Sequence, residues 1–277
     1  MSLTQFLDLP AVRQKFSEEF VLPKAQLSGT LKAPPMTAHY SLVGTAFDYL
    51  MRFYLQRLNP NSVVSNWVAE YAVALLKPDK RLYLKATGIL DNARKGYIKY
   101  LKSGSINEEI IKSSLLLAQL DPIYRAGYID PKLGTIESKD VLDLKNLISI
   151  VDSKFFRAKE RRILNPTFEE ASTLVGGADA DLLIDNMLID IKTVKDLKFT
   201  RKYYYQLIGY YILLKIGKVK GLDSSKQITK IGIYYSRYGI AHIIPNSSIE
   251  ENPHLSDFVQ WLKDTAKKVY STINLKY

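Results

Sequence analysis

The sequence predicts an α/β fold with a largely helical first half, and three observations support this prediction. Helical periodicity runs through most of the first 165 residues, strand-like alternation with turn residues appears twice afterwards, and a helical pattern follows each strand pair. The chain is 47% hydrophobic and 24% charged over 277 residues, which provides ample material for a core. We predict a mostly helical region over 1–165 that is part of, or packed on, an α/β core over 166–277.

Each expected element follows from a local pattern. Three prolines between residues 20 and 40 indicate an irregular connection. Apolar residues then recur on one helical face, and a period of two marks the strands. Helices are expected over 41–58, 64–76, 82–104, 107–127, 138–156, 201–217 and 255–273, and two hairpins over 173–195 and 228–245, the second turning at Tyr238-Gly239.

The composition excludes several classes of site. Because the chain has no cysteine, disulfides, thiolate zinc sites, iron–sulfur clusters and cysteine nucleophiles are not expected. With three histidines, a three-histidine metal site is not expected, and His39 is interpreted as a loop residue. Any metal should therefore be a hard cation bound by oxygen. The chain has no membrane-length apolar run and no signal-peptide pattern, so we expect a cytoplasmic protein without a membrane partner.

The charge balance favours an anionic partner. The formal net charge is +11 and the sequence pI is about 9.4, and nucleic acid is a common partner of such chains. The segment KFTRKYYYQ (198–206) interleaves cations with tyrosines, so Arg201, Lys202 and Tyr205 are candidates for phosphate contact and base stacking. A general surplus of solubilising charge is the alternative explanation.

The segment GGADADLLIDNMLIDIKTVK (176–195) predicts a hairpin that carries charges inside its strands. Asp185-Asn186 suits a two-residue turn because both residues tolerate positive φ. Alternation then gathers the charged residues on one side of the hairpin and leaves the other side wholly apolar. The cross-strand pairs that follow are Leu183 with Leu188, Asp181 with Asp190, and Asp179 with Lys192.

Opposed aspartates suggest a metal site. Two carboxylates that face each other repel, and burial increases the cost. A divalent cation between Asp181 and Asp190 removes both problems, and Mg²⁺ accepts such ligands. Lys192 could then orient or help to deprotonate a water molecule, or stabilise charge on a phosphate. The structural alternative is an ion pair of Asp179 with Lys192 and a solvated strand start at Asp181.

These residues resemble the signature of the PD-(D/E)xK nuclease superfamily. Asp181 matches the aspartate of its first strand, and Asp190-Ile191-Lys192 matches the triplet of the next strand. In QLIGY, Gln206 and Tyr210 are similar to the Gln-x-x-x-Tyr helix of the RecB-like and Cas4-like branch. The segment GTAFDYL is similar to the early helix motif of that branch, with Asp48 in place of a histidine.

The resemblance implies a mixed central sheet flanked by helices and a metal-dependent nuclease. It implies Mg²⁺ or Mn²⁺ bound by Asp181, Asp190 and the backbone carbonyl of Ile191, with Asp48 as a further candidate ligand. Lys192 would act on the attacking water. Gln206 and Tyr210 would position the lysine or the DNA. The cysteines that hold an iron–sulfur cluster in Cas4-like proteins are absent here, so no cluster is expected.

The expected function is hydrolysis of DNA phosphodiester bonds. Since no Walker-type loop occurs, work on duplex ends would need a separate helicase or other partner, and a homo-oligomer is also compatible with the sequence. A catalytically inactive nucleic-acid-binding or assembly protein with the same fold is the main alternative, and a helical interaction module or another enzyme is a third. A further acidic ligand is open among Glu70, Glu169 and Glu170.

Overall fold

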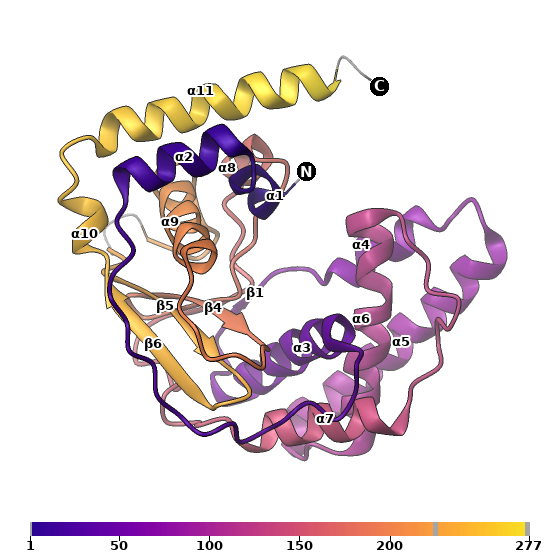
Figure 1. The fold of residues 1–277 in the computed structure, drawn as a ribbon. Helices are drawn as coiled ribbons and strands as arrows, with labels where there is room; N and C mark the ends of the chain where they lie inside the picture. The colour runs from indigo at the N-terminus through magenta and orange to yellow at the C-terminus, as the bar shows by residue number, and fades with distance from the viewer. Residues whose placement is uncertain (1, 224–226, 275–277) are drawn as a thin grey trace.

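A computed structural model describes residues 2–223 and 227–274, and it has an α/β architecture built on one six-stranded sheet (Figure 1). The helices are α1 (Leu3–Leu7), α2 (Pro10–Glu19), α3 (Tyr40–Leu58), α4 (Val68–Leu75), α5 (Lys80–Ser103), α6 (Glu108–Ala126), α7 (Ser138–Ser149), α8 (Glu170–Leu174), α9 (Arg201–Ile216), α10 (Ser247–Glu250) and α11 (Leu255–Asn274). The strands are β1 (Val63–Val64), β2 (Arg162–Leu164), β3 (Leu182–Ile184), β4 (Met187–Lys192), β5 (Lys230–Tyr235) and β6 (Ile240–Pro245). Within these described ranges, no helix is long and apolar enough to cross a bilayer.

The sheet is mixed, and its strands lie side by side in chain order from β1 to β6. The pairs β1–β2 and β4–β5 are parallel, and the other three neighbouring pairs are antiparallel. A parallel pair needs a long crossover connection. Helix α9 lies within the crossover from β4 to β5, and helices α4 to α7 lie between β1 and β2.

Helices cover both faces of the sheet, and strand alternation assigns each side chain to one face. Ile189 of β4 packs into the core formed with α3 to α7, whereas its neighbour Leu188 packs into the core formed with α1, α2, α9 and α11 (Figure 1). The side of the hairpin that was predicted to be wholly apolar therefore faces the helical half of the chain. Leu183, Leu188 and Lys192 of the predicted acidic side face α9.

Most predicted elements are confirmed, and the differences have local reasons. Strands β1 and β2 were not predicted, because two or three residues are too few to display a period, and the helix predicted over 64–76 begins only at Val68. The predicted helix over 138–156 is wrong beyond Ser149, since the chain turns there and Phe156 packs edge-on against Tyr234, at a centroid distance of 4.8 Å. Helix α8 occupies Glu170–Leu174 and overlaps the start of the predicted hairpin segment.

The regions before and after residue 165 share one sheet, and both contribute to each of the two cores. Strands β1 and β2 precede residue 165, and they extend the same sheet as β3 to β6. The first helices also pack against the last one. Phe16 of α2 meets Phe258 of α11 edge-on at a centroid distance of 4.9 Å, and both rings are buried in the core that α9 also lines.

Residues 20–39 form an irregular strap that joins α2 to α3, as the prolines predicted. Figure 1 shows the strap passing outside β6 to the start of α3. The N–H groups of Lys32 and Ala33 both donate to the carbonyl of Arg237, at 3.0 Å each. The Arg237 guanidinium donates to the Ala33 carbonyl at 3.0 Å and to Asp143 of α7 at 2.7 Å, and both charged residues are fully buried. One buried ion pair thus holds the strap, the β5–β6 turn and α7 together.

The turn of the first hairpin is confirmed at Asp185-Asn186. Asp185 has a φ of 51°, in the left-handed region that aspartate tolerates. Its carboxylate accepts backbone N–H groups of Lys159 at 3.2 Å, Glu160 at 2.9 Å and Arg161 at 3.0 Å. Burial alone would raise the pKa of Asp185, but these three donors outweigh it and lower the pKa.

Replacing Asp185 by asparagine should destabilise the fold in a pH-dependent manner. Asparagine tolerates the same φ, so the variant mainly removes charge, and we expect a loss of about 1–2 kcal/mol at pH 7. Because the folded pKa is depressed, the contribution of the carboxylate is complete above its unfolded pKa, near 4, and disappears as the pH falls through the folded pKa. Urea unfolding at pH 7 and at about pH 3 measures this. An equal difference at both pH values would contradict the account.

Candidate active site

The register of the β3–β4 hairpin is the one predicted from its turn. Leu183 pairs with Leu188, and Leu182 pairs with Ile189. The ladder ends at that second pair. The predicted cross-strand pair of Asp181 with Asp190 is therefore not formed.

The side chain of Asp181 explains where the ladder ends. Its Oδ2 accepts the backbone N–H of Ile191 in β4 at 2.5 Å, so a carboxylate takes a donor on the facing strand. The chain before Leu182 instead stays paired on the β2 side, where Asp179 bridges to Thr167. Asp181 consequently reaches β4 through its side chain rather than through its backbone.

Asp179 does not meet Lys192, and that predicted pairing is wrong. The Asp179 carboxylate lies 3.4 Å from Arg125 of α6, a residue that also lies 3.6 Å from Asp121. Arg125, which is 54 residues away in the sequence, thus neutralises Asp179. Lys192 is left to other partners.

Lys192 joins the end of β4 to helix α9. Its ammonium lies 2.7 Å from Oδ2 of Asp190 and donates to Oε1 of Gln206 at 2.9 Å. Gln206 in turn donates to the hydroxyl of Tyr210 at 2.8 Å, because residues four apart share one face of a helix. Asp190, Gln206 and Tyr210 are all buried. The structure therefore brings four of the predicted site residues into one continuous chain of contacts.

The cap of α9 sets the position of this chain of contacts. The Thr200 hydroxyl accepts the N–H of Tyr203 at 3.3 Å and starts the helix there. Gln206 then lies on the turn that faces β4. The Lys192 ammonium also lies 5.2 Å from the centre of the Tyr203 ring, a cation–π distance.

Asp48 approaches the same site from α3. One turn before it, a Cβ on Gly44 would lie 3.8 Å from Thr193, the residue that follows β4. Oδ2 of Asp48 is 2.5 Å from the Arg52 guanidinium, while its Oδ1 is buried and accepts no hydrogen bond. The charge of Asp48 also raises the pKa of Asp181. The residue at the expected histidine position is thus an acid beside the hairpin.

The site concentrates negative charge away from water. Burial, followed by the charges of Asp190 and Asp48, raises the pKa of Asp181 well above its usual range. Burial lowers the pKa of Lys192, but Asp190 and Asp181 more than compensate, and the net pKa is raised. Lys192 is therefore a cation at neutral pH. Burial and the same two aspartates raise the pKa of Tyr210, which remains a neutral hydroxyl.

The donor set fits a hard divalent cation. All the candidate ligand atoms are oxygens. Oδ1 of Asp48 is buried and accepts no hydrogen bond, whereas Oδ2 of Asp190 has the Lys192 ammonium 2.7 Å away as its partner. Within the described residues, however, these aspartates do not converge into a group of three ligand atoms within 4.8 Å of one another. The carbonyl of Ile191 stays a predicted ligand.

The other acidic candidates have different surroundings. Glu70 accepts the backbone N–H of Trp67 at 3.2 Å and pairs with Arg94 at 2.6 Å, so it caps α4. Glu169 and Glu170 line a separate groove that also contains lysines. Asp48 is therefore the additional acid that neighbours Asp181.

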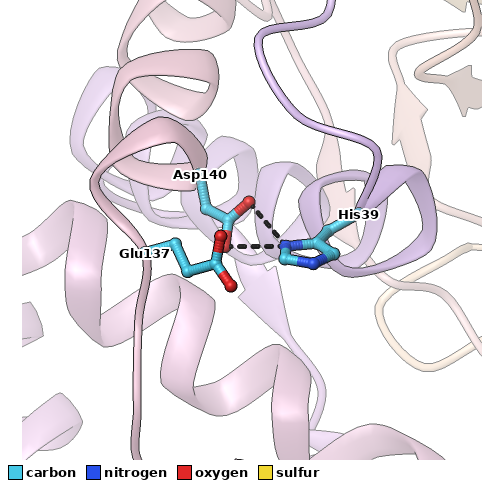
Figure 2. Close-up of side chains that lie close together, drawn as sticks. All are labelled: His39, Glu137 and Asp140. Carbon is cyan, nitrogen blue, oxygen red and sulfur yellow. Dashed lines mark hydrogen bonds and ion pairs between the residues drawn. The ribbon is translucent and has the colours of Figure 1, made fainter.

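The structure also contains a second cluster of side chains of the types that bind metals, which no sequence motif predicted. His39, at the start of α3, places Nδ1 3.0 and 3.1 Å from the two carboxylate oxygens of Asp140, and Glu137 lies beside them (Figure 2). Asp140 is 1% exposed. As predicted, His39 lies in the loop that precedes α3. Its partner Asp140 is 101 residues away in the sequence, so no local pattern could have revealed their contact.

The predicted nucleic-acid contacts divide into exposed and buried residues. Arg201 and Lys202 are exposed on the first turn of α9. Tyr205 is 5% exposed, and its ring packs on Phe16 at a centroid distance of 5.4 Å. The expectation that Tyr205 stacks on a base is corrected accordingly, because helix α2 covers its ring.

Comparisons with family models, with curated proteins and with solved structures found no match to this chain.

Proposed function

We propose that this protein is a divalent-metal-dependent nuclease with a PD-(D/E)xK-like core that hydrolyses phosphodiester bonds of DNA. The observation that carries the proposal is the contact chain from Asp190 through Lys192 and Gln206 to Tyr210. An ammonium held beside a buried carboxylate is an arrangement suited to phosphoryl chemistry. The net charge of +11 supports a polyanionic substrate.

Asp181 and Asp190 would hold the cation, with the Ile191 carbonyl and Asp48 as further ligands. When bound, a divalent cation polarises a phosphate oxygen and lowers the pKa of a bound water. The crowding of Asp48, Asp181 and Asp190 supports this role, because a cation relieves their repulsion.

Lys192 supplies a fixed positive charge next to the carboxylates. Its raised pKa keeps the ammonium protonated, so it acts as a cation and hydrogen-bond donor rather than as a base. Such a group can orient the attacking water and stabilise the charge that develops on the phosphate. Gln206 positions the ammonium by accepting one of its hydrogens, and Tyr210 anchors the amide of Gln206.

The second candidate is a nucleic-acid-binding protein of the same fold without catalysis. It is favoured by one observation: Asp48, Asp181 and Asp190 do not form a three-ligand group within 4.8 Å in the described part of the chain. A protein of this kind would bind DNA equally well with and without divalent ions.

A cleavage assay with an Asp190→Asn variant separates the two candidates. The purified protein is incubated with linear duplex, circular duplex, single-stranded DNA and RNA, in Mg²⁺, in Mn²⁺ or in EDTA. We expect metal-dependent cleavage by the wild type and a loss of about 10²–10³-fold in the variant. Asp91→Asn, which changes a half-exposed side chain of α5, is the matched control and should keep full activity. Binding without cleavage in every condition would favour the second candidate.

A further inference from the structure

A groove of about 970 Å³ lies beside the candidate active site, between helices α1 and α2 on one side and the first turns of α9 on the other. Asp8 and Arg13 line the first wall, and Arg201 and Lys202 line the second. The segment 198–206 predicted the second wall as a nucleic-acid contact, whereas no sequence motif indicated the first wall.

The groove leads to the contact chain of the site. Gln206 is one of its lining residues, and the amide oxygen of Gln206 accepts the Lys192 ammonium at 2.9 Å. A ligand that lies along the groove would therefore end at Gln206, one hydrogen bond away from Lys192.

The two walls are bridged by a single carboxylate. Oδ1 of Asp8 lies 3.2 Å from the Arg13 guanidinium, and Oδ2 lies 3.2 Å from the Lys202 ammonium. These side chains are between 46% and 63% exposed, so the pairs are solvated and exchangeable. Together with Arg201, the groove has three cations and one anion. A phosphate group could take the place of the carboxylate and contact both walls.

The spacing of the walls favours one strand over two. A single carboxylate spans from Arg13 to Lys202, so the opening between these two cations has the width of one charged group, enough for one phosphate backbone and not for two side by side. Among the described residues that line the groove, Tyr205 is the one aromatic residue, and its ring is buried. The groove thus offers contacts to the backbone and no stacking platform, which predicts binding without base preference.

We propose that this groove binds the phosphate backbone of a single DNA strand through Arg13, Arg201 and Lys202, and leads it to Lys192. Asp8 holds the cations of the two walls in the absence of the strand and is displaced by a phosphate. The inference rests on the proposed nuclease function for its direction toward Lys192, but the binding itself does not require cleavage.

Binding is measured by fluorescence anisotropy with a labelled 20-nucleotide oligothymidine in EDTA, over a range of salt concentrations. Arg13→Ala should weaken binding about five- to tenfold and reduce the slope of log affinity against log salt by about 0.7, the value for one phosphate contact on a single strand. Arg81→Ala, on an exposed turn of α5, is the matched control and should change neither quantity.

Asp8→Asn should change the affinity for DNA in the opposite direction from Arg13→Ala. Because the carboxylate competes with phosphate for Arg13 and Lys202, its neutralisation should strengthen binding about threefold or more. A residue with only a structural role would not improve affinity when replaced. Thermal melts check that each variant is folded.

Three results would overturn the inference. The first is that the Arg13→Ala variant binds the oligothymidine as tightly as the Arg81→Ala control does. The second is that a duplex of equal length binds as tightly as the single strand and loses the same affinity in Arg13→Ala. A polyglutamate peptide could also bind in place of DNA, which would assign the groove to an acidic peptide.

The same data separate this inference from the proposed function. If the groove variants alter binding while no metal yields cleavage by the wild type, the groove assignment holds and the nuclease proposal fails. If the wild type cleaves DNA while Arg13→Ala has unchanged affinity and an unchanged KM, the groove assignment fails alone.

Discussion

Replacement of Lys192 by methionine is expected to reduce DNA cleavage by about 10²–10³-fold while DNA binding stays near the wild-type level. Methionine approximates the length of the side chain but removes the ammonium that lies 2.7 Å from Asp190 and donates to Gln206. Binding should persist, because the exposed cations of the groove lie outside this contact chain. Single-turnover cleavage and EDTA-buffered binding measure the two quantities.

Lys192→Arg tests whether charge alone suffices. Arginine keeps the charge, but its planar group cannot reproduce a compact ammonium between Asp190 and Gln206, so activity should lie between wild type and Lys192→Met. Lys230→Met, which changes an exposed lysine at the start of β5, is the control and should cleave normally. Wild-type cleavage by Lys192→Met would remove Lys192 from the mechanism.

Replacement of Arg237 by methionine is expected to lower the free energy of unfolding by about 3–5 kcal/mol. The guanidinium is 1% exposed and its partner Asp143 is 0% exposed, at 2.7 Å. The variant leaves Asp143 buried with the Met36 N–H at 3.1 Å as a remaining donor. Most of the loss therefore comes from an uncompensated buried charge. Urea denaturation followed by circular dichroism measures it.

A double variant separates the burial of charge from a loss of packing. Arg237→Met combined with Asp143→Leu replaces the pair by apolar groups of similar size, and it should be more stable than Arg237→Met alone. Arg81→Met, at an exposed site, should leave the unfolding free energy unchanged. A double variant that is no more stable than the single one would contradict the charge argument.

The part of the site that could be predicted from sequence depends on short-range geometry. The Asp185-Asn186 turn has two residues, which fixes the register of the strands that it joins, and Leu183 does pair with Leu188. Gln206 and Tyr210 share a helix face because they are four residues apart. Both inferences need only the local periods of strand and helix.

The rest depends on partners that are distant in the chain. Arg125 pairs with Asp179, although the two residues are 54 positions apart in the sequence. Asp181 ends the strand ladder because its carboxylate accepts the Ile191 N–H. Helix α2 covers Tyr205 with Phe16, although nothing in the tyrosine run indicates it. Tertiary packing decided each of these outcomes, and a single sequence contains no local signal of it.

The packing of Phe16 on Phe258 has a consequence for the biosynthesis of the protein. The two rings are 242 residues apart in sequence, so α2 acquires this neighbour only after α11 has left the ribosome. Helix α2 also forms one wall of the basic groove. Helix α2 is therefore fixed in place long after its own translation, and nascent chains that are stalled before Phe258 should lack a complete groove.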